Sequence, residues 1–130
     1  MGMLEDFTEL LIARGFDMSD VIRGPFVDTP DSQTALIPTP SFTPPLTYCG
    51  AIYEIHRLAV QVRRADGVSA RNRAQLIYQD LFSVADVIAG ASIFANVIPQ
   101  TAPFWLDEDA NGRSVYGVNI EIHRREYVAS

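Results

Sequence analysis

The chain has 130 residues, 48% hydrophobic and 20% charged, with a formal net charge of −6 at pH 7. This composition excludes a largely disordered chain, and no apolar run is long enough to span a bilayer. The acidic balance argues against a protein that grips nucleic acid through its phosphates, because such binding depends on Lys and Arg. The length predicts a single domain, residues 1–130, and the acidic start at Glu5 and Asp6 predicts cytosolic synthesis without a signal peptide.

The first predicted element is a helix at residues 4–14. Leu4, Phe7 and Leu10 recur at helical spacing, and Gly15 marks the end of the pattern. A helix of about three turns is not stable alone, so its apolar stripe must dock on the rest of the domain.

Two short strands are expected next. Residues 17–27 hold apolar side chains around a Gly-Pro break, and residues 34–39 form a second apolar run. Four prolines then fall within residues 38–45, and proline lacks the N–H group that a sheet interior requires. Two interpretations of this Pro-rich loop stay open. It is either a surface connection or an arm that lays Phe42 on a neighbouring molecule, since a stiff chain loses little entropy on docking.

The clearest strand of the first half spans residues 48–64. Leu58, Val60 and Val62 share one face, and mostly polar residues up to Arg63 share the other, a pattern typical of a half-buried strand. We place this strand at the centre of the sheet.

A second helix follows an Asp-Gly turn. Ser69 is its predicted N-cap, and apolar residues at helical spacing continue to Leu81. Residues 83–90 are expected to be irregular as the helix frays, and a further strand is predicted at residues 93–98 before a proline.

Residues 103–127 predict a hairpin near the end of the chain. From Tyr116 to Ile122 apolar residues alternate with polar ones, as in a half-buried antiparallel strand. The turn at Asp107–Arg113 supplies the Asp, Asn and Gly residues that tolerate positive φ. We expect this last strand to close the sheet. The order of elements predicts an α+β fold, in which an antiparallel or mixed sheet of about five to six strands carries two helices on one face.

One repeated tetrapeptide contains metal-ligand residue types. Glu-Ile-His-Arg occurs at residues 54–57 and again at residues 121–124. The alternation of the two strands puts His56 and His123 on different sides of the sheet. This argues against a shared divalent-metal site and favours two separate, hydrogen-bonded histidines.

The tip of the hairpin matches part of a calcium-binding loop. Asp107, Asp109, Asn111 and Gly112 occupy positions one, three, five and six of such a loop, but Val118 stands where the bidentate Glu is required. We therefore interpret the segment as a hairpin turn. No phosphate-binding loop or nucleophile–histidine spacing is present, so no enzyme, cofactor or metal site is predicted.

Arginines and acids are concentrated in two separate stretches, which we call the Arg-bearing band and the acidic tip. They are either two solvated faces or the two halves of a head-to-tail contact, in which the band of one subunit meets the tip of the next and closes a ring. The band consists of Arg63, Arg64, Arg71 and Arg73, and the tip of Asp107, Glu108 and Asp109 beside Trp105.

Three stretches together resemble a known family. They are VQVRRAD at the end of the long strand, SARNRAQLIYQDL in the second helix and WLDEDANGRSVYGVNIEIHR in the hairpin. In their order they are similar to the tail terminator or minor capsid (tail-to-head joining) proteins of long-tailed bacteriophages, over residues 20–125. The most specific piece is the D-x-N-G-R turn, formed by Asp109, Asn111, Gly112 and Arg113.

This resemblance implies a structural virion protein of the tail and neck, present in the host cytoplasm during assembly. It implies a homohexameric ring on the head-proximal end of the tail tube, which halts tube growth and meets a head-closure or connector protein. DNA is expected to pass through the lumen without sequence-specific binding, since an acidic wall repels phosphates. No enzymatic activity, cofactor or membrane is implied.

Two alternatives stay open beside a tail terminator. One is another neck component, such as a head-closure protein, and the other is a small soluble ligand-binding α+β module. The candidate oligomer or partner contacts are Phe42, Arg63, Arg64, Arg71, Arg73, Trp105, Asp107, Glu108, Asp109 and Arg113.

Overall fold

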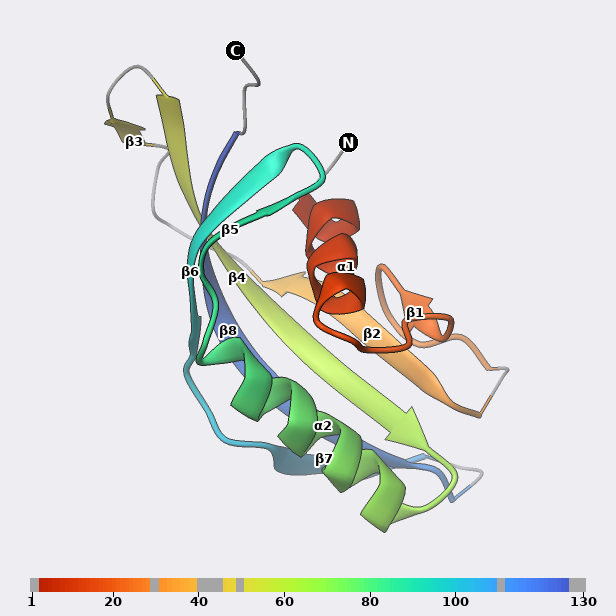
Figure 1. Cartoon of the computed structure of the whole chain (residues 1–130). Coiled ribbons are helices and arrows are strands. Elements are labelled where there is room, and N and C mark those ends of the chain that lie inside the picture. The colour runs from red at the N-terminus through yellow and green to blue at the C-terminus, as the bar shows by residue number, and fades with distance from the viewer. Residues whose placement is uncertain (1–2, 29–30, 40–45, 49–50, 110–111, 127–130) are drawn as a thin grey trace.

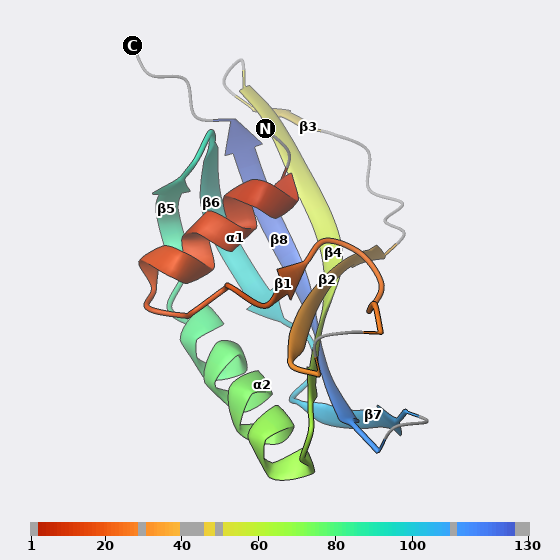
Figure 2. The ribbon, with the colours of Figure 1, turned by 90° about the vertical axis from the view of Figure 1, so that its right-hand side faces the viewer.

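The computed structural model describes residues 3–28, 31–39, 46–48, 51–109 and 112–126. Within these residues the chain forms two helices and one 8-stranded sheet. The sheet is strongly curled, and both helices lie against its concave face (Figure 1, Figure 2). The predicted α+β class is therefore confirmed, with two helices on one face and a sheet that is mixed because β1 and β2 are parallel.

The helices and strands divide the chain as follows. The elements are α1 (Met3–Ala13), β1 (Val21–Ile22), β2 (Gln33–Thr39), β3 (Leu46–Tyr48), β4 (Ala51–Arg64), α2 (Gly67–Leu81), β5 (Ala85–Ala89), β6 (Ser92–Pro99), β7 (Phe104–Glu108) and β8 (Ser114–Glu126). The strand order is β1-β2-β4-β8-β6-β5, and in addition β3 pairs with β4 and β7 pairs with β8.

β4 and β8 form the centre of the sheet. They pair antiparallel from Tyr53 with Arg125 to Arg64 with Ser114. β2 and β3 both lie along the outer side of β4, and β6 and β7 both lie along the outer side of β8. The central position predicted for the long strand is confirmed, but the expectation that the last strand closes the sheet is wrong. β8 has 13 residues and β7 only 5, so the part of β8 that the hairpin leaves unpaired takes β6 as its partner.

The apolar core fills the concave face of the sheet. It combines one apolar stripe from each helix with alternating residues of the strands, as predicted for β4 and β8. Phe7 of α1 meets Phe94 of β6 edge-on, with ring centroids 6.0 Å apart. The largest fully buried side chains are Phe7, Phe94, Leu10, Leu11, Leu36, Leu58, Ile77, Leu81, Ile120, Ile122, Gln33 and Val60.

Two strands lie outside the predicted set, β3 and β5. The predicted strand 48–64 is divided, because β3 ends at Tyr48, β4 begins at Ala51, and the two strands pair with each other. β5 occupies Ala85–Ala89, where irregular chain is predicted. Asp86 has a φ of 52°, which interrupts the regular extended backbone and with it the alternation by which a strand is recognised.

The first half of the chain otherwise follows the prediction. α1 matches the predicted helix, and Gly15 after it has a φ of 95°, a conformation that glycine adopts without strain. Only two residues of the predicted segment 17–27 form a strand. β2 includes Pro38 from the Pro-rich loop, whereas residues 40–45, and with them the predicted arm residue Phe42, lie outside the described residues.

The N-cap of α2 is Asp66, not the predicted Ser69. Asp66 has extended backbone dihedrals, and its Oδ1 accepts a hydrogen bond of 2.8 Å from the Ser69 backbone N–H. The Ser69 hydroxyl donates to the other Asp66 oxygen at 3.0 Å. The Asp-Gly pair that reads as a turn therefore begins the helix, because a carboxylate just before the first helical residue satisfies an N–H that the helix leaves unpaired.

Two neighbouring residues of α2 allow a matched test of the core. Ile77 is fully buried, whereas Leu76 is 57% exposed. We expect Ile77→Ala to lower the free energy of unfolding by roughly 2–5 kcal/mol, because a cavity adds to the lost burial. Leu76→Ala should change it by less than about 0.5 kcal/mol. Urea unfolding measures both, and equal losses would contradict this packing.

Asp66 should make stability depend on pH. Hydrogen bonds from the Ser69 backbone and hydroxyl hold the pKa of the Asp66 carboxyl below its ordinary value. A carboxyl with a lowered folded-state pKa stabilises the protein above its unfolded pKa, and this stabilisation is lost as the pH falls through the folded pKa. Asn at this position still caps the helix but does not titrate. The loss of stability in Asp66→Asn, relative to the unsubstituted protein, should therefore grow as the pH rises to about 4 and stay constant above it. Urea unfolding from acidic to neutral pH measures this loss. A deficit independent of pH would exclude this role.

Candidate assembly interface

The turn between β7 and β8 is closed by Asp109 and Arg113. The Asp109 N–H donates to the Arg113 carbonyl at 2.9 Å, and the Arg113 N–H donates to the Asp109 carboxylate at 2.9 Å. The Arg113 side chain returns to the same carboxylate through Nε at 2.6 Å. Gly112, whose φ is 76°, donates its N–H to the Asp109 carbonyl. Asp109 and Arg113 of the D-x-N-G-R motif therefore lock the tip of the hairpin.

Arg113 also fastens this turn to the segment before β2. Its guanidinium lies 3.2 Å from the Asp31 carboxylate and 3.5 Å from the Asp28 carboxylate, and it donates to the Asp28 carbonyl. Burial of the guanidinium works to lower the pKa of Arg113, but the hydrogen bonds and charges of Asp109 and Asp31 outweigh it, so the pKa is raised. One cation is thus shared by three carboxylates, which suits the planar, five-donor guanidinium.

Arg63 lies under the same segment and is 4% exposed. It donates to the carbonyls of Val27 and Asp31 at 2.7 and 3.1 Å, and its guanidinium stacks 5.0 Å from the centre of the Phe26 ring. Burial, followed by the nearby charge of Arg113, lowers its pKa. Its Nη1 is 3.9 Å from Asp109 Oδ2, so a band residue and a tip residue meet inside one subunit.

The other three arginines of the band lie in different surroundings. Arg64 forms an ion pair of 2.9 Å with Asp20, next to β1. Arg73 donates to the Asp17 carbonyl and stacks 5.3 Å from the centre of the Phe16 ring, and burial lowers its pKa. Arg71, on the outer side of α2, is exposed.

β7 presents the exposed part of the tip. Trp105 is 57% exposed and Leu106 38%, and the carboxylates of Asp107 and Glu108 face solvent. In the part of the chain that the structure describes, β7 pairs with β8 alone, so its outer edge is open. β7 packs closely on β8, because a Cβ at Gly117 would lie 2.8 Å from the Leu106 side chain. The strand is therefore held firmly while its apolar and acidic side chains stay accessible.

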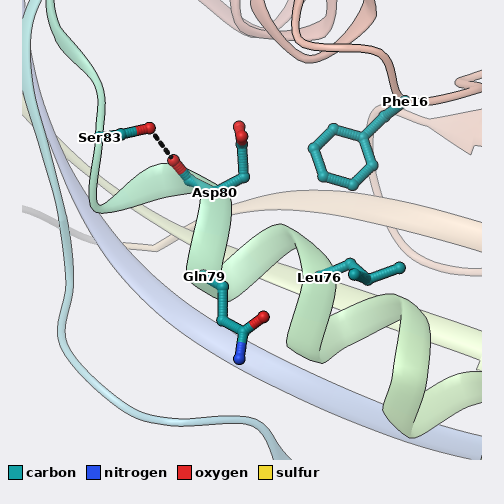
Figure 3. A pocket seen from close by; sticks show the side chains of 5 residues that line it. All are labelled: Phe16, Leu76, Gln79, Asp80 and Ser83. Atoms are coloured by element: carbon teal, nitrogen blue, oxygen red, sulfur yellow. Dashed lines mark hydrogen bonds between the residues drawn. The ribbon is translucent and has the colours of Figure 1, made fainter.

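Two shallow hollows lie beside α2. One, of about 350 Å³, is lined by Gly67, Val68, Arg71 and Tyr116, and Tyr116 is the register partner of Trp105. The other, of about 390 Å³, is lined by Phe16, Leu76, Gln79, Asp80 and Ser83 (Figure 3). At the second hollow, Arg14 Nε forms an ion pair of 2.5 Å with Asp80 Oδ2. Neither hollow brings together groups that suggest catalysis.

The two histidines lie on opposite faces of the sheet, as the alternation predicts. His56 is in register with Ile122, and His123 with Ile55, the neighbour of His56. Each ring contacts a glutamate two residues earlier in its own strand, at 3.1 Å. Among the described residues no three His, Cys, Asp or Glu side chains gather as metal ligands, and no helix is long and apolar enough to cross a membrane.

The sequence analysis missed a buried polar network under α1. Asp6 is fully buried, and its Oδ2 accepts from the Ser92 hydroxyl, which accepts from Arg124 Nε, both at 2.5 Å. Arg124 Nη1 also forms an ion pair with Glu54 Oε2 at 2.5 Å. Asp6 precedes Leu10 by one helical turn and so shares the buried stripe of α1, which is the one sequence signal of its burial. The network fixes α1 to β6, β8 and β4.

The chain matches a known protein family. A family described as bacteriophage tail terminator protein matches residues 10–126. No curated protein matches the chain.

Arg113 should control the order of the hairpin tip. Replacing it by Met removes the cation that Asp28, Asp31 and Asp109 share, and leaves their charges facing one another. We expect the amides of residues 112–114 to exchange hydrogen roughly tenfold faster or more, the size of effect that a lost charged hydrogen bond gives. The exposed Arg71, replaced by Met, is the matched control. Equal exchange in the two variants would show that Arg113 does not hold the tip.

Proposed function

The chain belongs to the bacteriophage tail terminator family, and we propose that it forms a ring that caps the tail tube and joins it to the head connector. Proteins of this family are structural components of the virion tail that interact with other tail and head components. The family match carries the proposal, because residues 10–126 include α2 and all eight strands of the sheet. On this proposal the protein works by shape and contact, without catalysis or a cofactor.

We propose that the ring is a homohexamer closed by head-to-tail contacts, which form a ring whenever the rotation between neighbours closes. The curled sheet supports this arrangement, since it ends in different strands on its two sides, with β1 at one side and β5 and β7 at the other. One end of the ring would stop the growth of the tube, and the other would offer a surface to a head-closure protein. Assembly would take place in the host cytoplasm before the virion is complete.

The predicted contact residues divide into two groups in this proposal. Arg63, Asp109 and Arg113 contribute indirectly, because their contacts inside the subunit fix the position of the tip. The proposed direct contacts are Trp105, Asp107 and Glu108 on the tip side, with Arg64, Arg71 and Arg73 as candidate basic partners. The role proposed for Phe42, contact with a neighbouring molecule, concerns a residue outside the described part of the chain.

Charge supports the proposed passage of DNA through the ring. The chain carries a net charge of −6, and three of its arginines, Arg63, Arg113 and Arg124, are buried. Positive groups that could retain phosphates are thereby withdrawn from the surface, while the carboxylates of Asp107 and Glu108 stay exposed. DNA would pass such a surface without sequence-specific contact.

The mass of the purified protein and its effect on tail tubes test this function. We expect light scattering to give a multiple of the 14.4 kDa subunit consistent with a closed ring. Electron microscopy should show tubes that end in a ring and stop growing when the protein is added. A protein that is monomeric at high concentration and leaves the tubes unchanged would refute the proposal.

The same assay tests the acidic tip with a matched control. Reversing both Asp107 and Glu108 to Arg should weaken assembly at low salt by roughly tenfold, since two favourable charges become repulsive. Glu9→Arg, at an exposed acid of α1, should leave assembly unchanged. If the tip variant and the control assemble alike, the tip takes no part in the contact.

A further inference from the structure

One row of residues crosses the sheet from β1 to β7. Val21, Thr34, Val62, Tyr116 and Trp105 are successive register partners on β1, β2, β4, β8 and β7. Neighbouring strands are about 4.8 Å apart, so the four steps separate Val21 and Trp105 by about 19 Å along the curled sheet. β1 and β7 are therefore the two ends of this row and face away from each other.

Both ends of the row lack a partner strand within the described ranges, where β1 pairs only with β2 and β7 pairs only with β8. On the outer side of β1 the Val21 N–H already donates to the Met18 carbonyl, so this edge offers the Val21 carbonyl as an acceptor. An open edge with exposed apolar side chains is a site for pairing with another chain. In most proteins such edges are short, charged or covered, which prevents this pairing. β7 carries exposed Trp105 and Leu106 at this edge. On the opposite edge, the half-buried Val21 and Ile22 border a small hollow of about 120 Å³.

The strand directions at the two ends are complementary. β7 is antiparallel to β8, β8 to β4, and β4 to β2, while β1 is parallel to β2. β1 therefore runs antiparallel to β7. In a ring whose axis runs along the strands, rotation leaves the strand direction unchanged, so β1 of the next copy meets β7 as an antiparallel partner. This geometry is the more favourable one for hydrogen bonding between strands.

We propose that β7 of one copy pairs with β1 of the next, with Trp105 and Leu106 covering the Val21–Ile22 edge. The occupant is a second copy of this chain, because the chain itself carries both open ends of the row with matching direction. The inference rests on the proposed ring and specifies the surfaces that close it. Placed in this way, β7 lies along β1 of the next subunit, where the Val21 carbonyl is its backbone acceptor and the apolar side chains supply most of the contact.

The charges around the two edges fit this placement. Asp107 is in register with Val115, Val115 with Arg63, and Arg63 with Gln33. This second row lies next to the row of Trp105, on the side of the residues that precede β1. Those residues contact two arginines, through the Arg64–Asp20 ion pair and the bond from Arg73 to the Asp17 carbonyl. Glu108 is in register with Ser114, and Ser114 with Arg64, so Glu108 of one copy would share a face with Arg64 and approach Arg64 and Arg73 of the next.

Cysteine cross-linking tests the pairing. Cys49 is replaced by Ser in every variant, and Trp105→Cys is combined with Val21→Cys in one and with Ile22→Cys in another, which covers a shift of one residue. A disulfide needs Cα atoms about 4.4–6.8 Å apart, so two residues that lie four strand steps apart in one chain, with three strands between them, cannot be bridged. Any bond must join two chains. We expect oxidation to give a ladder of multimers up to the ring, which a reductant abolishes.

The matched control joins Val21→Cys with Ile88→Cys. Ile88 is also exposed on an edge strand, β5, on the same side of the sheet as β7. This pair should give no ladder. If the unsubstituted protein forms a ring but both Trp105 pairs stay unlinked, or the control links equally well, the β7–β1 contact is wrong while the proposed function stands. If the unsubstituted protein forms no ring, the proposed function fails and the inference fails with it.

Discussion

The antiparallel pairing of β4 and β8 is the constraint on which the rest of the molecule depends. Both strands are longer than any neighbour, so each has room for two shorter strands on its outer side. This makes the sheet wide at both ends and leaves different strands at its edges. The two helices then need only one face, and the apolar alternation of the two long strands supplies it. The edges proposed to take part in assembly are thus a consequence of the lengths of two central strands.

The arginines act mainly as internal connectors. Arg113 joins the hairpin tip to the segment before β2, Arg63 lies under that segment, and Arg124 links β8 to α1 through Ser92 and Asp6. Each makes several directed contacts from a single side chain, which the guanidinium allows and the point charge of a lysine does not. The positive charges of these arginines therefore lie inside the subunit, where each guanidinium has hydrogen-bond acceptors. The surface that remains is correspondingly acidic.

Local patterns predicted most elements but not their neighbours in space. The alternation of β4 and β8 and the stripes of both helices follow from residue spacing alone, because burial of one face demands that spacing. β5 could not be predicted from residue spacing, because the positive φ of Asp86 interrupts the strand. The central position of β8 could not be predicted in this way either, since its partner β6 is not joined to it by a tight turn. The tip was located from the sequence, whereas its link to Arg63 depends on where residues 26–28 and Asp31 lie in the fold.

The properties of β7 are best understood in relation to an assembly. An exposed tryptophan on an open strand is a liability in an isolated subunit, because any other edge can pair with it. β7 limits that risk by being short, by an irregularity between Trp105 and Asp107, and by ending in two acids. These features disfavour pairing of β7 with most other strand edges. They still allow pairing with a short edge that has arginines nearby. β1, with two residues and Arg64 and Arg73 beside it, is such an edge. A contact restricted in this way fixes one neighbour geometry, which closes the proposed ring if its rotation closes and continues as an open fibre if it does not.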